Sequence, residues 1–129
     1  MPTDLPLTYE TFWQDERLTC AVAATLRVIA GRWKVLILRE LLPTPQRFNQ
    51  LQRALVGISS KVLAEQLRQM EQDGIIHRQE FAELPLRVEY ALTPLGQQLH
   101  PVLHHLHQWG HAYLTLHPDR SEQWVAGDD

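Results

Sequence analysis

The chain has 129 residues and a mass of 15.0 kDa, which is the size of one ordinary domain. Hydrophobic residues make up 44% and charged residues 21%, and no apolar run approaches the roughly 18 residues of a membrane span, so a membrane-spanning protein is excluded. The net charge of −3 conceals a basic middle, because residues 17–68 carry nine Lys or Arg and only two Glu. This asymmetry favours contact with a polyanion, although solvated basic faces would give the same count.

A single cysteine cannot build an internal disulfide framework, and residues 1–10 lack the basic and apolar regions of a secretory signal. We therefore expect a cytoplasmic protein. Its expected organisation is an N-terminal arm over residues 1–16 that contacts a partner chain, one domain over 17–118, and a flexible polar tail over 119–129.

The first two elements are predicted from apolar spacing. Aromatic side chains three and four residues apart predict a short helix over 8–15, with an apolar edge formed by Tyr9, Phe12 and Trp13. Residues 20–30 are apolar almost throughout and predict a buried helix that Cys20 would begin and Gly31 would end.

Two shorter helices follow. Apolar residues on one face predict a helix over 33–42, which Pro43 ends. Asn49 is expected to cap a short helix that runs to Leu55, and Gly57 then makes a tight turn.

The next helix has the clearest start signal of the chain. Ser59 is expected to cap it, and it runs through Gln72 before Asp73 and Gly74 end it. Apolar residues spaced by four and three form its inward stripe: Leu63, Leu67 and Met70.

The last third of the chain predicts a hairpin and a long helix. Two short alternating runs, 75–81 and 87–92, predict a half-buried antiparallel hairpin with a polar tip. Thr93 and Pro94 are a cap and a first helical residue, and the helix they begin is expected to run over about 94–116.

Two short helices joined by a glycine turn and followed by a hairpin predict a winged helix-turn-helix: a mainly α fold with a small β-hairpin wing and a long C-terminal helix. In this arrangement the second helix enters the DNA major groove, the first braces it, and the hairpin reaches an adjacent groove or the backbone. The expected DNA-binding residues are Arg47, Arg53, Ser59, Ser60, Lys61, Ala64, Glu65, Arg68, Arg78 and Arg87. An amphipathic helix with a merely solvated outer side would show the same pattern.

The outer side of the second helix has the residue types that contact with DNA requires. Ser60 suits a phosphate, and the small Ala64 permits close approach to base edges. Lys61 and Arg68 can meet phosphates or guanines. Glu65 is anionic, so near DNA it must accept from cytosine, pair with Arg68 or point away.

An ordered set of residues and short motifs covers about three quarters of the chain: Cys20, Gly31-Arg32-Trp33-Lys34, Leu36-Ile37-Leu38-Arg39-Glu40-Leu41, Arg47-Phe48, Gly57-Ile58-Ser59, Lys61-Val62-Leu63, Leu67, Glu71, Asp73-Gly74-Ile75-Ile76, Arg78, Pro85, Arg87-Val88-Glu89-Tyr90, Leu92-Thr93, Gly96, Leu99, Pro101-Val102-Leu103, Leu106 and Trp109-Gly110. Residues 20 to about 114 thereby resemble the HxlR family of bacterial winged-helix repressors and activators, relatives of the MarR group. The resemblance implies a transcriptional regulator that binds a palindromic operator in double-stranded DNA as a homodimer. It also implies that the helix after Ser59 lies in the major groove and that residues 78–87 form the wing.

The long C-terminal helix carries a heptad seam, with spacings of four and three residues: Leu95, Leu99, Val102, Leu106, Trp109, Tyr113 and Leu116. Part of the seam is expected to pack on the helices of residues 20–42 and the rest to form the dimer interface. Pro101 removes one backbone hydrogen bond, so a kink is expected there. The resemblance supports a contact of Phe12 and Trp13 with the partner chain.

Cys20 occupies the family's redox position, although the family's Cys-Pro is Cys20-Ala21 here. A thiol at a helix start, three residues after Arg17, is favoured as the reactive thiolate. Being the sole thiol, it would react with a small molecule or with a partner chain. A sensor of oxidants or electrophiles is therefore one hypothesis, and a small buried hydrophobe is the other.

Four histidines in the long helix form a stripe: His100, His104, His107 and His111. Pairs four residues apart can chelate zinc, nickel or copper. No cysteine or carboxylate in 95–117 completes such a site. We therefore favour a polar helix face over a metal site, and no cofactor is expected.

An enzyme is not expected, because the sequence has no phosphate loop, nucleophile elbow or paired-carboxylate spacing. Cys20 with the histidines could suggest Cys–His catalysis, but nothing orients the base. A winged helix that mediates only protein contacts is the remaining alternative.

Overall fold

The computed structural model describes residues 16–121, with the backbone alone for residues 16–19. It contains two compact units, one that ends at Ala30 and one that begins at Gly31. The helix expected over 8–15, including Phe12 and Trp13, lies outside the described residues, as does most of the tail. The expected domain boundaries therefore stay predictions.

The described part of the first unit is helix α2, Glu16–Ile29. This corrects two expectations. Cys20 lies in the second turn rather than at the helix start, so its backbone N–H is not one of the unbonded terminal donors. The helix is also not buried: Ile29 is its one buried side chain among those described, whereas Cys20 is exposed and Leu26 is 54% exposed. The apolar side of α2 is left uncovered by the single chain, since Val22 is exposed as well.

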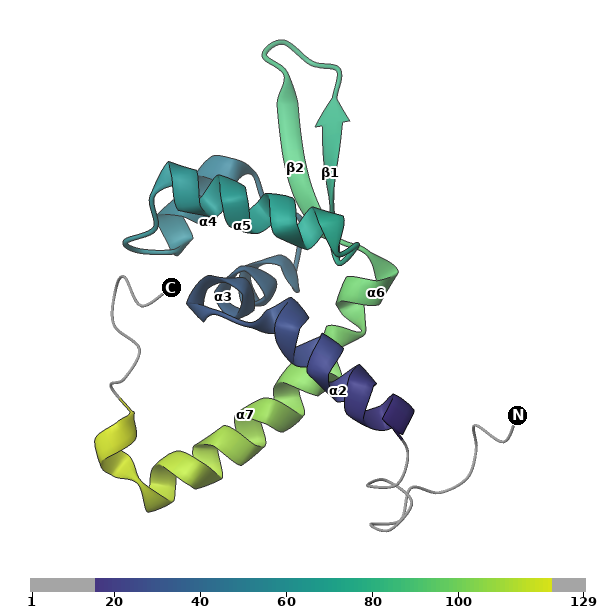
Figure 1. Ribbon diagram of the computed structural model, residues 1–129. Coiled ribbons are helices and arrows are strands. Elements are labelled where there is room, and N and C mark those ends of the chain that lie inside the picture. Colours follow the sequence, from purple (N-terminus) through teal and green to yellow (C-terminus); the bar gives the residue numbers. More distant parts are fainter. Residues whose placement is uncertain (1–15, 122–129) are drawn as a thin grey trace. The chain divides into compact units, whose positions relative to one another are not determined.

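The second unit contains the predicted winged helix-turn-helix (Figure 1). Its elements in chain order are α3 (Arg32–Leu41), α4 (Phe48–Ala54), α5 (Ser60–Gln72), β1 (Ile76–Phe81), β2 (Arg87–Leu92), α6 (Pro94–Gln97), α7 (Leu99–Leu116) and the short 3-10 helix η1 (Pro118–Arg120). The strands project past α4 and α5 as one arm.

Helix α3 is the centre of this unit's core. It contacts α4, α5 and β2, and its residues Ile37 and Leu38 are completely buried. The apolar residues predicted to point inward from α5 are buried against this core: Leu63, Leu67 and Met70. At about 1.5–3 kcal/mol for each large side chain removed from water, this stripe is what holds α5 in place.

The start of α4 differs from the prediction. The capping residue is Arg47 and not Asn49, which lies inside the first turn. Arg47 has an extended backbone, and the side-chain oxygen of Gln50 accepts a hydrogen bond from its backbone N–H at 2.7 Å. Because Gln50 satisfies the terminal donor from within the helix, no Asn side chain is needed as the cap.

The hairpin has the predicted antiparallel pairing, with Arg78 opposite Tyr90. Gln46 adds a bridge on the other side of β2, where it exchanges two backbone hydrogen bonds of 2.9 and 2.8 Å with Tyr90. The segment before α4 is thereby tied to the wing. The expected alternation of burial along β2 is absent, because Arg87 to Ala91 are all half-buried.

The predicted long helix is interrupted, as expected, but at Gln98 rather than at Pro101. Proline has no N–H to donate to the carbonyl four residues earlier, and that carbonyl belongs to Gln97, the last residue of α6. The break therefore falls where the hydrogen bond is lost. Among the described residues, no helix combines the length and apolar character that crossing a bilayer requires.

Helix α6 is pressed against the chain just before β1. A Cβ atom built on Gly96 would lie 2.0 Å from the backbone oxygen of Ile75, and backbone cannot rotate away as a side chain can. The Thr93 hydroxyl holds the same corner, since it donates to the Gly74 carbonyl at 2.6 Å and accepts from the Gly96 N–H at 3.0 Å. This corner requires glycine.

Gly96→Ala is therefore expected to lower the free energy of unfolding by about 1–3 kcal/mol, the usual cost of overpacking. Urea denaturation measures it. Gly110→Ala is the matched control, because no atom lies within 4 Å of its added Cβ and alanine is the better helix former. Equal stability of Gly96→Ala and the wild type would contradict this account of the corner.

Candidate nucleic-acid interface

Helices α4 and α5 form a closed helix-turn-helix. Leu51 of α4 and Leu55, the residue just after it, are buried, as is Ile58 in the turn. Gly57 between them has a φ of +94°, a left-handed conformation that other residues adopt only with strain. The turn and its apolar contacts fix the angle at which α5 leaves α4.

The beginning of α5 is held by side chains as predicted. The Ser59 hydroxyl accepts a hydrogen bond from the Val62 N–H at 3.1 Å and so caps the helix. The Ser60 hydroxyl lies 2.9 Å from the amide nitrogen of Gln52 on α4 and 3.2 Å from its oxygen. Ser60 was predicted as a phosphate contact, and the structure gives it this tie to α4 in addition.

The outer side of α5 is exposed at Lys61, Ala64 and Arg68. Of the three possibilities for Glu65, the structure contains the pair with Arg68, whose Nε lies 3.1 Å from a Glu65 oxygen. The Arg68 hydrogen bond lowers the pKa of Glu65, and the Gln69 amide adds to this. Glu65 is therefore an anion whose charge is partly matched from its own helix.

The wing has no net positive charge, because its glutamates outnumber its arginines. Arg78 pairs with Glu80 at 2.6 Å, and this hydrogen bond raises the pKa of Arg78. Over residues 76–92, two arginines face three glutamates. A phosphate contact by Arg78 stays a prediction, and it would have to share or replace Glu80.

Arg87 is held more tightly still. Its guanidinium pairs with Glu83 at 2.8 Å and with Glu89 at 2.7 Å, and it covers the Phe81 ring with 3.9 Å to the ring centre. The side chain is only 26% exposed. Arg87 therefore braces the hairpin, and its predicted contact with DNA is untested.

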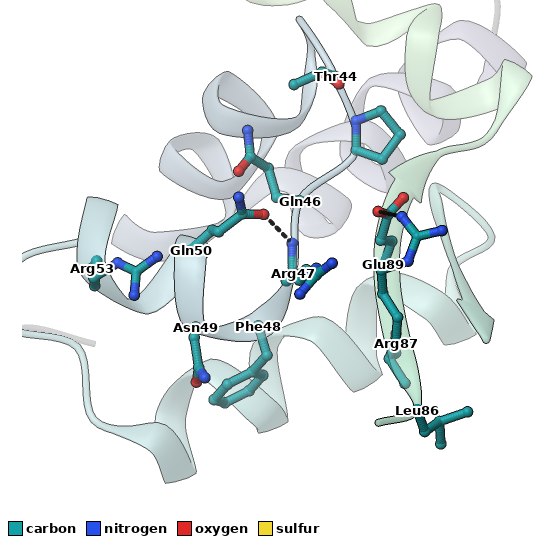
Figure 2. Close-up of a pocket in the computed structure, with 12 residues that line it drawn as sticks. Thr44, Gln46, Arg47, Phe48, Asn49, Gln50, Arg53, Leu86, Arg87 and Glu89 are labelled. Carbon is teal, nitrogen blue, oxygen red and sulfur yellow. Dashed lines mark hydrogen bonds and ion pairs between the residues drawn. The ribbon is translucent and has the colours of Figure 1, made fainter. Parts of the chain in front are cut away.

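A hollow of about 680 Å³ lies between the start of α4 and the start of β2, and Figure 2 shows its lining. Arg47 and Arg53 line it from the α4 side, and no carboxylate among the described residues pairs with either, nor with Lys61. Figure 2 shows Arg87 across the hollow, turned to Glu89. The hollow thus presents unmatched positive charge next to the wing.

The predicted dimer seam is uncovered in the single chain. No residue of α7 is buried, and Val102, Leu106 and Trp109 are 36%, 44% and 70% exposed. Leu99 and Tyr113 are half-buried, and the Tyr113 ring stacks on that of Trp109 at 5.5 Å. Contiguous exposed apolar surface of this kind marks an interaction site.

The four predicted histidines are all exposed, and the rings of His107 and His111 stack at 6.2 Å. Within residues 16–121, no three or more histidine, cysteine or acidic side chains come together as a metal site would require. His100 and His104 have no ring contact with each other. The choice of a polar helix face over a metal site stays a prediction.

Two polar residues that support α5 were not predicted. Gln52 binds Ser60, and Gln69 binds both Lys34 of α3 and Glu65. The spacing of Glu65 and Gln69, four residues apart on one helix, is a signal that could have found the second contact. The contact with Lys34 joins residues 35 positions apart, so only the fold reveals it.

Taken together, a short helix, a glycine turn, a capped helix with an exposed basic side and a β-hairpin define the winged helix-turn-helix class of DNA-binding regulators. The family model for HxlR-like helix-turn-helix proteins matches residues 28–118. The chain belongs to this family and is a transcriptional regulator with a helix-turn-helix DNA-binding domain.

Individual relatives agree with the family. YdeP of Bacillus subtilis (strain 168), an uncharacterized HTH-type transcriptional regulator, is 40% identical over 99 residues, which are 77% of each chain. A MarR-family transcriptional regulator from Enterococcus faecalis V583 is 36% identical with a TM-score of 0.71, over 91% of this chain and 98% of its own. The redox regulator HypR in its reduced form is 34% identical with the same TM-score of 0.71, over 77% of this chain and 98% of its own.

Proposed function

We propose that the protein binds a palindromic operator as a homodimer, with one α5 in each of two major grooves on the same face of the duplex. The observation that carries the proposal is the exposed side of α5, which presents Lys61 and Arg68 around the small Ala64. A helix of this kind fits the major groove, and small side chains let it approach the bases. A protein that binds chromosomal DNA acts in the compartment that holds the chromosome, which agrees with the expected cytoplasmic location. We propose a binding protein and no catalytic role.

In this arrangement the DNA backbone would pass over the hollow beside α4. The one carboxylate that lines this hollow, Glu89, pairs with Arg87, and neither Arg47 nor Arg53 has a carboxylate partner among the described residues, so these two are the first choice for phosphate contacts. Ser60 would add a hydroxyl at the start of α5. Arg78 and Arg87 would approach the DNA backbone from the wing. The wing would add little net positive charge there, because both arginines already pair with glutamates.

The second copy would cover the seam of α7. Leu106 and Trp109 are exposed to water in the single chain. Burying these apolar side chains against a second copy would stabilise the dimer. Two DNA-reading helices held at a fixed separation also explain why an operator would be palindromic, since the symmetry of the protein is repeated in the DNA.

Lys61→Ala and Arg68→Ala are each expected to weaken binding to an operator selected from a random-sequence duplex pool. Losing a phosphate contact should reduce the slope of log Kd against log salt by about 0.9. Fluorescence anisotropy across a salt series measures both quantities. Arg120→Ala, an equal charge change on η1, is the control and should bind as the wild type does. Normal binding by both α5 variants would refute the assignment of α5 as the reading helix.

Leu106→Glu is expected to convert the dimer to monomer and to abolish operator binding at concentrations where the wild type is saturated. A charge buried in an apolar interface has no partner and strongly disfavours association. Analytical ultracentrifugation gives the mass. His104→Glu adds the same charge to an exposed site on the same helix and should stay dimeric. A wild-type protein that sediments as a monomer would overturn the proposed assembly.

We also propose that Cys20 makes DNA binding sensitive to oxidants or electrophiles. Two observations support it: the thiol is exposed on α2, and the relative HypR is a redox regulator. Being the chain's sole thiol, Cys20 would form a disulfide with the partner chain's cysteine or with a small thiol.

Treatment with diamide is therefore expected to change operator affinity severalfold in the wild type and not in Cys20→Ser. Anisotropy before and after treatment measures the change, and added dithiothreitol should reverse it. Equal responses from the two proteins would remove Cys20 from the account. Ser121→Cys in the Cys20→Ser background moves the chain's one thiol to another exposed position, and so tests whether any surface thiol suffices.

A further inference from the structure

A line of hydrogen bonds runs from the core helix to the exposed side of α5. The Lys34 ammonium on α3 donates to the side-chain oxygen of Gln69 at 2.7 Å, and the Gln69 amide nitrogen donates to Glu65 at 3.1 Å. Glu65 in turn accepts from Arg68, whose Nε lies 3.1 Å away. The line therefore begins at a half-buried lysine and ends at an exposed guanidinium.

The donors and acceptors along this line can be arranged in one way only. An ammonium only donates, so the oxygen of the Gln69 amide must face Lys34. The amide nitrogen then faces Glu65, and a carboxylate only accepts. Arg68 closes the line as a donor. Reversing the amide would place its oxygen against the Glu65 carboxylate and its nitrogen against the Lys34 ammonium, which is unfavourable at both ends.

The position of Lys34 gives the line a rigid origin. Its neighbour Trp33 and the next-turn residue Ile37 are buried, so α3 cannot shift to follow a movement of Gln69. At the other end, Arg68 uses its Nε and Nη2 atoms for Glu65. A guanidinium has five N–H groups, so about three remain directed away from the carboxylate.

We propose that Lys34 is a positioning residue for DNA reading: through Gln69 and Glu65 it orients the Arg68 guanidinium toward the major groove without touching DNA itself. This rests on the proposed function, because it requires α5 to lie in the groove. It gives Glu65 the role of a support for Arg68 and not of a cytosine reader.

The test compares Lys34→Met with Arg39→Met, which removes the same charge from the same helix but lies outside the line and pairs with its neighbour Glu40. Lys34→Met is expected to weaken operator binding about 3- to 10-fold, the range of one lost hydrogen bond. Its affinity for random-sequence duplex should equal that of Arg39→Met. The salt slope should not change, whereas a lost phosphate contact would reduce it by about 0.9.

Two further measurements separate positioning from a general effect on the fold. The carboxyl pKa of Glu65, followed by NMR, should rise in Lys34→Met, because both the Lys34 charge and the Gln69 hydrogen bond lower it. Lys34→Arg keeps a donor-only cation and should restore part of the lost affinity. In Lys34→Met combined with Gln69→Met, the second change should add nothing to the first.

If Lys34→Met does not fold, Gln69→Glu tests the same positioning role. It retains an acceptor for Lys34 but offers no donor to Glu65, so the same loss of operator affinity is expected. Operator binding equal to that of Arg39→Met, or a salt slope reduced by about 0.9, would overturn the proposal. A wild-type protein that does not discriminate operator from random DNA would instead overturn the proposed function, and the Glu65 pKa would still report whether the line exists.

Discussion

The packing of α5 on α3 fixes the direction of every other functional element of the second unit. Leu63, Leu67 and Met70 are buried against this core, and the opposite side of the same helix is the one exposed to solvent. A helix of 3.6 residues per turn cannot turn one side inward without fixing the direction of the other. The hydrophobic stripe thus decides which side chains can reach DNA, although none of its residues would touch it.

Ion pairs with the protein's own glutamates reduce the positive charge that the predicted DNA-binding residues present to solvent. Arg68, Arg78 and Arg87 are paired with glutamates, whereas Lys61, Arg47 and Arg53 have no carboxylate partner among the described residues. Paired arginines are oriented but contribute less to non-specific attraction. The affinity of one chain for DNA of any sequence would then be moderate. Selectivity for the operator would come from two chains that read two half-sites together.

Much of the second unit could be predicted from local signals. Ser59 as a cap, Gly57 and Gly74 as turns, and the inward stripe of α5 each follow from residue types a few positions apart, and the structure confirms them. The errors have physical causes as well. Asn49 is a favoured residue type for a helix cap and is therefore the predicted one, but Arg47 is the capping residue and Gln50 accepts the hydrogen bond from its backbone N–H. The nearly continuous apolar composition of residues 20–30 predicts burial that α2 does not have, because composition shows which residues are apolar and not whether anything covers them.

The candidate site was harder to predict than the fold. Residue types identified the basic side of α5, but not the ion pairs of Arg87 with Glu83 and Glu89, which depend on the hairpin being folded. The contact of Lys34 with Gln69 depends on α3 meeting α5. Side chains far apart in the chain acquire their partners only through tertiary packing, and a single sequence carries no direct signal of it.

In the proposed assembly, two α5 helices, held apart by a dimer, read two half-sites on one face of the duplex. Hydroxyl-radical footprinting on a selected operator would show this arrangement. The account predicts two protected patches related by two-fold symmetry, with centres about one helical turn or a whole multiple of it apart. A single patch, or uniform weak protection along the duplex, would contradict it.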